Sequence, residues 1–67
     1  MSMAAAEFPA YEYSIKDMRV LAARHAVHAE RYKGDPEIPY DYVMLFFNDG
    51  TTAEYTYDED KGVYVLL

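Results

Sequence analysis

The 67-residue sequence contains no cysteine and only two serines, Ser2 and Ser14. Without cysteine, the chain has neither the disulfides nor the thiolate zinc sites that often stabilise domains of this size, so a compact core or self-association has to supply its stability. Carboxylates are abundant, but they cluster in predicted turns and on exposed strand faces. Burial shifts the pKa of a carboxyl group little at such positions, so acid–base catalysis has weak support there. We therefore expect a cytoplasmic protein that is not an enzyme and uses no cofactor.

Long apolar runs are also missing. No stretch approaches the ~18 apolar residues of a membrane-spanning helix, and the N-terminal MSMAAAEFPA lacks the basic region of a secretion signal. However, 52% of the residues are hydrophobic, with eight tyrosines and three phenylalanines, which is too apolar a composition for a disordered chain. A single folded domain over residues 1–67 is expected.

Basic residues are outnumbered by acidic ones, six to twelve, and the two kinds are separated along the chain. Residues 14–33 contain five basic and two acidic residues, whereas residues 34–67 contain eight acidic residues and Lys61 alone. The folded molecule should therefore be electrically two-sided. Its acidic part repels nucleic acid and attracts basic protein surfaces, so we expect a protein partner and no direct binding of nucleic acid.

A helix is predicted over residues 14–33. Ser14 and Asp17 have the spacing of a capping box, and Gly34 followed by Pro36 is a stop signal. Eight residues share one stripe of this helix, which is the expected core face: Ile15, Met18, Leu21, Ala22, His25, Ala26, Ala29 and Tyr32.

Residues 40–67 alternate with a period of two and predict two consecutive β-hairpins, with NDG and DEDKG as turns. In the second hairpin, Tyr57 is expected to lie opposite Val63. That register places three residues on the core face, Val63, Val65 and Leu67, and leaves Tyr64 and Leu66 on the reverse.

The first hairpin allows two registers. A two-residue turn would bring Tyr42, Met44 and Phe46 to the core face, whereas a three-residue turn from Asn48 to Gly50 would bring Val43, Leu45 and Phe47 there. We favour the three-residue turn, because it buries the aliphatic set. The first set then lies with Glu54 on the face away from the helix, as an apolar patch of the kind that marks an interface.

The expected fold is α+β, with one amphipathic helix packed on a three-stranded antiparallel sheet in the order α-β-β-β. The N-terminal EFPAYEYS, which begins within the arm of residues 1–13, is a candidate cover for the apolar patch of the sheet. The sequence leaves open whether this arm adds an edge strand to the sheet or stays extended.

Two groups of residues resemble metal sites. His25 and His28 lie three residues apart on the predicted helix, but a third ligand is missing and neighbours such as Glu30 point elsewhere. Residues 58–62 resemble the start of a calcium loop, but glycine stands fifth instead of sixth and the glutamate of the twelfth position is missing. No metal site is expected, and a turn with a positive φ accounts for Gly62.

Carboxylates alternate with tyrosines in short stretches such as YDY at 40–42 and EYTYDED at 54–60. Tyrosine rings anchor protein interfaces and carboxylates pair with arginine, so this surface suits a pocket lined with basic residues, including one that ordinarily holds DNA or RNA. The alternative is a solubilising acidic surface. The predicted partner-binding residues are Asp58, Glu59, Asp60, Glu54, Asp41, Tyr42, Phe46 and Tyr64.

The helix capped at Ser14 and the acidic, tyrosine-rich hairpins from Tyr40 to Leu67 together resemble the small phage-encoded anti-CRISPR proteins. That family has no shared sequence motif, so the resemblance assigns a role to no particular residue. It implies an inhibitor, monomeric or weakly dimeric, that evades host defence in the bacterial cytoplasm by binding an effector complex where target DNA docks, as a DNA mimic. The basic helix departs from a uniformly acidic mimic. A competing hypothesis is a structural or regulatory partner, such as an antitoxin or accessory subunit, that binds through the aromatic sheet face.

Overall fold

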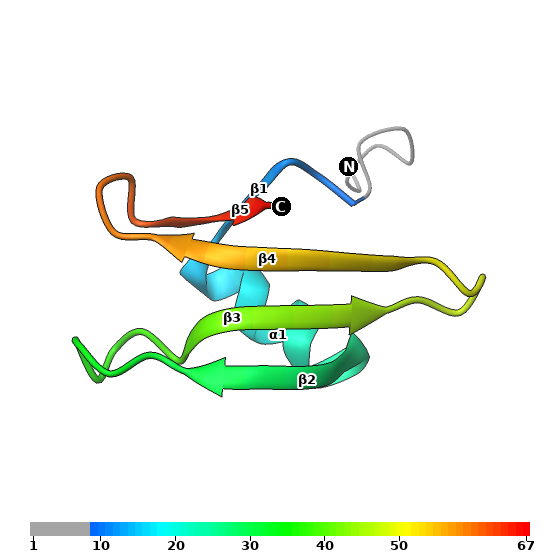
Figure 1. The fold of residues 1–67 in the computed structure, drawn as a ribbon, viewed down its shortest axis with the longest axis horizontal. Coiled ribbons are helices and arrows are strands. Elements are labelled where there is room, and N and C mark those ends of the chain that lie inside the picture. The colour runs from blue at the N-terminus through cyan, green and yellow to red at the C-terminus, as the bar shows by residue number, and fades with distance from the viewer. Residues whose placement is uncertain (1–8) are drawn as a thin grey trace.

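A computed structural model describes residues 9–67 of the chain. The elements follow in the order β1 (Glu12–Ser14), α1 (Ile15–His25), β2 (Ala26–Arg31), β3 (Tyr40–Phe46), β4 (Thr52–Asp58) and β5 (Val63–Leu66). The five strands form one antiparallel sheet with the spatial order β1-β5-β4-β3-β2. The helix thus connects the two edge strands and crosses one face of the sheet (Figure 1). Within the described range, no helix is long and apolar enough to cross a bilayer.

The prediction of a three-stranded sheet is wrong. The strands of the two hairpins are present, but each edge of that three-stranded unit gains a further strand. On one side β1 pairs with β5, with Tyr13 opposite Tyr64, and on the other β2 pairs with β3, with Ala29 opposite Val43. Strand β1 lies in the segment predicted as an N-terminal arm, of which residues 1–8 are outside the described range.

The helix begins where the sequence predicts and ends eight residues early. Ser14 caps it by accepting a hydrogen bond from the backbone N–H of Asp17 at 3.0 Å. The predicted second half, Ala26–Arg31, is strand β2 although its composition favours a helix, and none of its side chains is buried. The unpaired edge of β3 supplies backbone partners to this segment, so strand pairing overrides local propensity.

The core lies between α1 and the sheet. Met18, fully buried, and Leu21 of the helix pack against the sheet residues Val43 and Leu45, which are also buried. Tyrosines supply much of the remaining volume, and the ring centroids of Tyr13 and Tyr55 are 5.4 Å apart. Burial of these large rings compensates for the small number of aliphatic residues in a domain of this length.

The preferred register of the first hairpin is confirmed. Leu45 lies opposite Ala53 and Val43 opposite Tyr55, with a three-residue loop in which Gly50 has a φ of 90°. This conformation explains the glycine, because residues with a Cβ rarely adopt it.

The predicted register of the second hairpin is wrong by one residue. Tyr57 lies opposite Tyr64, and Asp58 lies opposite Val63. A carboxylate oxygen of Asp58 accepts hydrogen bonds from the backbone N–H groups of Asp60 and Lys61, so the turn starts one residue later than expected. The shift reverses every side chain of β5. It buries Tyr64 and turns Val63 and Val65 to the opposite face.

Candidate functional site

The face of the sheet opposite α1 carries tyrosine, apolar and acidic side chains. Tyr42, Met44 and Phe46 point to this side, because the alternate residues Val43 and Leu45 are buried beneath the helix. Figure 1 views the sheet from this side, with α1 behind it, and no helix or strand of residues 9–67 crosses in front. We call this surface the open face. Strand pairing places the following residues on it: Glu12, His28, Glu30, Tyr42, Met44, Phe46, Glu54, Thr56, Val63 and Val65.

Carboxylates surround an apolar centre on the open face. Tyr42 and Met44 are half-buried at the middle of the sheet, and Phe46 is 49% exposed. Glu30 is the cross-strand neighbour of Tyr42, and Glu54 is that of Met44. Tyr42 and Met44 therefore each have a negative charge beside them, whereas Phe46 lies opposite Thr52. This arrangement suits partners with basic groups next to an apolar contact.

A hydrogen bond and a ring contact hold Tyr42 in place. Its hydroxyl donates a hydrogen bond to Glu54 at 2.8 Å, and this bond to a carboxylate raises the pKa of the Tyr42 hydroxyl. The ring of His28 lies 5.9 Å from that of Tyr42, and its Nε2 is 3.3 Å from a carboxylate oxygen of Glu30. The tyrosine at the centre of the open face is thus oriented before any partner arrives.

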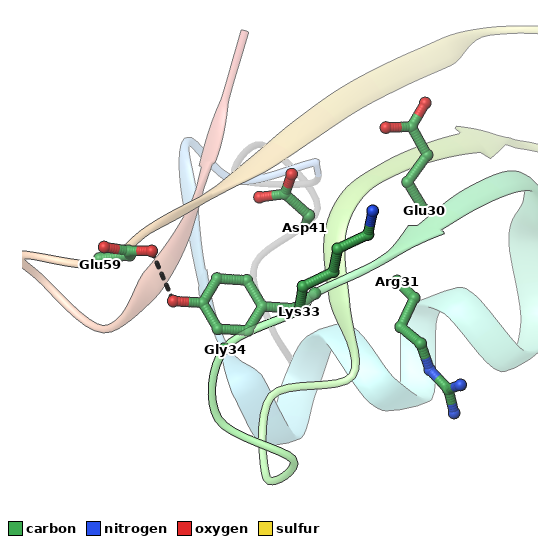
Figure 2. Close-up of a pocket in the computed structure, with 7 residues that line it drawn as sticks. Glu30, Arg31, Lys33, Gly34, Asp41 and Glu59 are labelled. Carbon is green, nitrogen blue, oxygen red and sulfur yellow. Dashed lines mark hydrogen bonds between the residues drawn. The ribbon is translucent and has the colours of Figure 1, made fainter.

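A surface depression of about 640 Å³ lies where β2 ends, and three carboxylates from separate segments line it. Glu30 comes from β2, Asp41 from β3 and Glu59 from the β4–β5 turn. Figure 2 shows Lys33 extending toward the side where Asp41 and Glu30 lie, whereas Arg31 points the opposite way. We call this feature the acidic depression. Arg31 and Lys33 also line it, but only Lys33 extends toward the carboxylates, so the depression suits a guanidinium or ammonium group of a partner.

Tyr32 also lines the acidic depression and contacts Glu59 of the β4–β5 turn. Its hydroxyl donates a hydrogen bond of 2.5 Å to Glu59, the dashed line in Figure 2. Its ring meets that of Tyr57 edge-on, with 5.2 Å between the centroids. The bond to Glu59 raises the pKa of Tyr32 to about 12. One of the predicted partner-binding carboxylates is therefore already engaged within the molecule.

Replacing Glu59 by glutamine is expected to lower the pKa of Tyr32 from about 12 toward its ordinary value of 10.0, because the charged acceptor is lost. Since the folded-state pKa is raised, the Tyr32–Glu59 contact stabilises the native protein fully below pH ~10 and is lost as the pH rises through about 12. Ultraviolet difference spectroscopy of the phenolate, with the ring assigned by NMR, measures this pKa. An unchanged Tyr32 pKa in the variant would show that the two groups do not interact in solution.

Gly34 permits the position of the Tyr32 ring. A Cβ added at this residue would lie 2.5 Å from the ring, which is closer than such atoms approach. We expect Gly34→Ala to displace the ring and to break the bond to Glu59, with little loss of stability because the added Cβ meets side-chain atoms and no backbone. The Tyr32 pKa should then fall as in the Glu59 variant, while urea unfolding changes little. Retention of the high pKa would contradict this packing.

The structure distributes the eight predicted partner-binding residues over different environments. Tyr42, Phe46 and Glu54 lie on the open face, and Asp41 and Glu59 line the acidic depression. Asp58, the last residue of β4, uses its carboxylate to accept backbone hydrogen bonds of the following turn, whereas Asp60 of that turn is exposed.

Tyr64 was placed incorrectly by the sequence. It has no exposed surface, and its hydroxyl donates to the carbonyl oxygen of Tyr40 at 2.6 Å and accepts from the N–H of that residue at 3.2 Å. Burial raises the pKa of the Tyr64 hydroxyl. Because the ring is enclosed in the core, Tyr64 supports the β2–β3 connector and cannot touch a partner.

Sequence reasoning missed Glu30 and Tyr32, because both were assigned to the helix. The one signal in the sequence is Val27, a β-branched residue that falls off the helical stripe and occupies β2. A single valine is too weak a signal to predict a strand. The position of these two residues beside β3 therefore follows from strand pairing alone.

The two histidines of the predicted metal-like motif belong to different elements. The ring of His25, the last residue of α1, lies 5.0 Å from that of Phe47, and His28 is on β2. Among residues 9–67, no cluster of three or more histidine, aspartate or glutamate side chains is arranged to hold a metal ion.

The chemistry of the open face and the acidic depression is compatible with binding a basic partner. Oriented tyrosines give flat contact area at low entropic cost, and the exposed carboxylates accept hydrogen bonds from basic side chains. Comparisons of the chain with protein-family models, with curated proteins and with solved structures found no match. A functional proposal has to start from this surface chemistry.

Proposed function

We propose that the protein is a non-catalytic inhibitor of a bacterial CRISPR-Cas effector complex and acts in the cytoplasm of the bacterial host. In this proposal a monomer docks its open face and acidic depression on a basic site of the effector that otherwise binds nucleic acid. The supporting observation is that carboxylates from four separate segments lie on or beside one face of the sheet. They are Glu30 of β2, Asp41 of β3, Glu54 of β4 and Glu59 of the β4–β5 turn, which is followed by the exposed Asp60.

The physical argument combines charge with contact area. A groove that binds a phosphate backbone offers arginine and lysine side chains, which pair with carboxylates as they do with phosphates. The open face adds the half-buried Tyr42 and Met44, which supply apolar contact that a nucleic acid backbone lacks. Electrostatic attraction then accelerates encounter, and the apolar centre slows dissociation.

The direct test is competition between this protein and target DNA for a purified effector complex. We expect stoichiometric inhibition, mutually exclusive binding, and an affinity that falls as salt rises. Simultaneous binding of DNA and protein would overturn the DNA-mimic mechanism. Inactivation by amounts far below stoichiometry would show that the protein is an enzyme.

The exposure of Phe46 favours a second candidate, a structural or regulatory partner such as an antitoxin or accessory subunit. Phe46 is 49% exposed at the end of β3 farthest from Asp41 of the acidic depression, and with the half-buried Met44 it offers an apolar contact. In that case Met44→Ala with Phe46→Ala should prevent assembly with the partner, whereas charge reversal should have little effect. Charge reversal therefore separates the two proposals, because it should weaken binding of the inhibitor strongly and assembly of the structural partner only slightly.

A further inference from the structure

A second surface depression, of about 760 Å³, adjoins β2 and differs in charge from the acidic depression. Arg19 of α1 and Arg31 of β2 line it, and Figure 2 shows the guanidinium of Arg31 on the side of β2 toward α1, away from Asp41. Ile38 and Tyr40 of the β2–β3 connector region add apolar surface, together with two prolines. No aspartate or glutamate is among the described residues that line it. We call this feature the arginine groove.

Both arginines retain hydrogen-bond donors. Arg19 uses one nitrogen to donate to the carbonyl oxygen of Glu37 at 2.8 Å, and a guanidinium has five N–H groups in all. Arg31 forms no ion pair or hydrogen bond through its side chain with any residue of the 9–67 range. Two guanidinium groups with free donors beside apolar surface are suited to carboxylates that are attached to an apolar group.

We propose that the arginine groove binds a short acidic peptide segment of a partner protein. Its carboxylates would pair with Arg19 and Arg31, and an apolar side chain between them would lie on Ile38 and Tyr40. A peptide fits better than a nucleic acid, because the chain has a net charge of −6 and the connector carries Asp35 and Glu37 close by. These charges repel an extended polyanion and tolerate a compact one.

The groove adjoins the acidic depression, since residues 31–34 line both, but the guanidinium of Arg31 points toward α1, away from Asp41 and Glu30. A protein that uses both sides can contact a basic and an acidic surface at once, which fits the two-sided charge of the chain. The inference does not depend on the identity of the partner of the open face.

Titration of the isotope-labelled protein with the acetylated and amidated peptide DELDE, followed by amide NMR, tests the proposal. We expect saturable shifts at amides around the groove, and an affinity at least about tenfold lower for Arg19→Glu with Arg31→Glu. The matched control, Lys16→Glu with Arg24→Glu, makes the same change of charge on exposed α1 residues that do not line the groove, and should bind within about twofold of the parent. Peptide DESDE, which lacks the apolar residue, should bind more weakly than DELDE.

Several results would overturn the proposal. These are no saturation up to ~1 mM peptide, equal loss of affinity in both double variants, or shifts confined to the open face. Tighter binding of a single-stranded DNA oligonucleotide of equal charge at the same amides would assign the groove to phosphates. If the amides around the groove shift when the protein alone is concentrated, the groove binds a second copy of the chain instead. Amide spectra report whether each variant is folded, and Arg31→Gln replaces the double variant if that one unfolds.

Discussion

Replacing Tyr64 by alanine is expected to abolish folding at 25 °C. The ring is fully buried, its centroid lies 5.2 Å from that of Tyr57, and its hydroxyl satisfies both backbone groups of Tyr40. Truncation of a buried aromatic residue costs about 3–5 kcal/mol. A domain of this length has a total stability of roughly 3–10 kcal/mol, so the loss removes much or all of it.

Tyr64→Phe separates the two contributions of this residue. The ring stays, but the backbone N–H and carbonyl of Tyr40 lose their partner, which costs about 1–3 kcal/mol. Urea unfolding followed by circular dichroism measures both variants, and Tyr11→Ala is the control because Tyr11 is 62% exposed. A Tyr64→Ala protein that unfolds cooperatively with nearly parental stability would show that the ring faces solvent, as the sequence alone suggested.

Reversing the charge of Asp41 and Asp60 is expected to weaken binding to the effector complex by about 10²-fold, since the partner's basic groups lose two attractions and meet two repulsions. Both aspartates are exposed, so the fold should tolerate lysine at either position. Most of the loss should appear as a slower association rate that depends less on salt. Surface plasmon resonance at several salt concentrations measures both quantities.

The matched control for this experiment is Asp17→Lys with Glu37→Lys. Each replacement changes the net charge by +2, so both double variants have a net charge of −2 in place of −6. The control residues are exposed and lie on α1 and the connector, away from the open face. Equal effects of the two double variants would mean that overall charge, and not the proposed surface, drives association. An unchanged inhibitor after reversal of Asp41 and Asp60 would contradict the DNA-mimic proposal.

The parts of the fold that were predicted correctly depend on residues close together in sequence. Ser14 caps the helix by accepting a hydrogen bond from a backbone N–H only three residues further along the chain. The Asn48–Gly50 loop sets the register of the first hairpin through a glycine with positive φ. Helix caps and hairpin turns depend on residues within one turn of the chain, so they can be predicted without knowledge of the rest of the molecule.

The errors came from choices between competing pairings. Ala26–Arg31 satisfies helical propensity in isolation, but an unpaired edge of β3 is available only after the sheet has formed. In the second hairpin, the carboxylate of Asp58 takes two backbone hydrogen bonds in the turn, and the resulting shift of one residue exchanges the faces of β5. Both errors affected the predicted site. The helix assignment caused Glu30 and Tyr32 to be missed, and the wrong register assigned Tyr64 to the surface.

The amino-acid sequence by itself determined that the chain is acidic, rich in tyrosine and free of cysteine, and that it forms a capped helix and two hairpins. Only the tertiary structure decided which carboxylates share a face and which arginines line a groove. The physical reason is that side chains on strands alternate between two faces, so a shift of one residue, or the addition of an edge strand, redistributes them without changing any local preference. Those choices depend on backbone groups far apart in the sequence, and they are made when the sheet assembles.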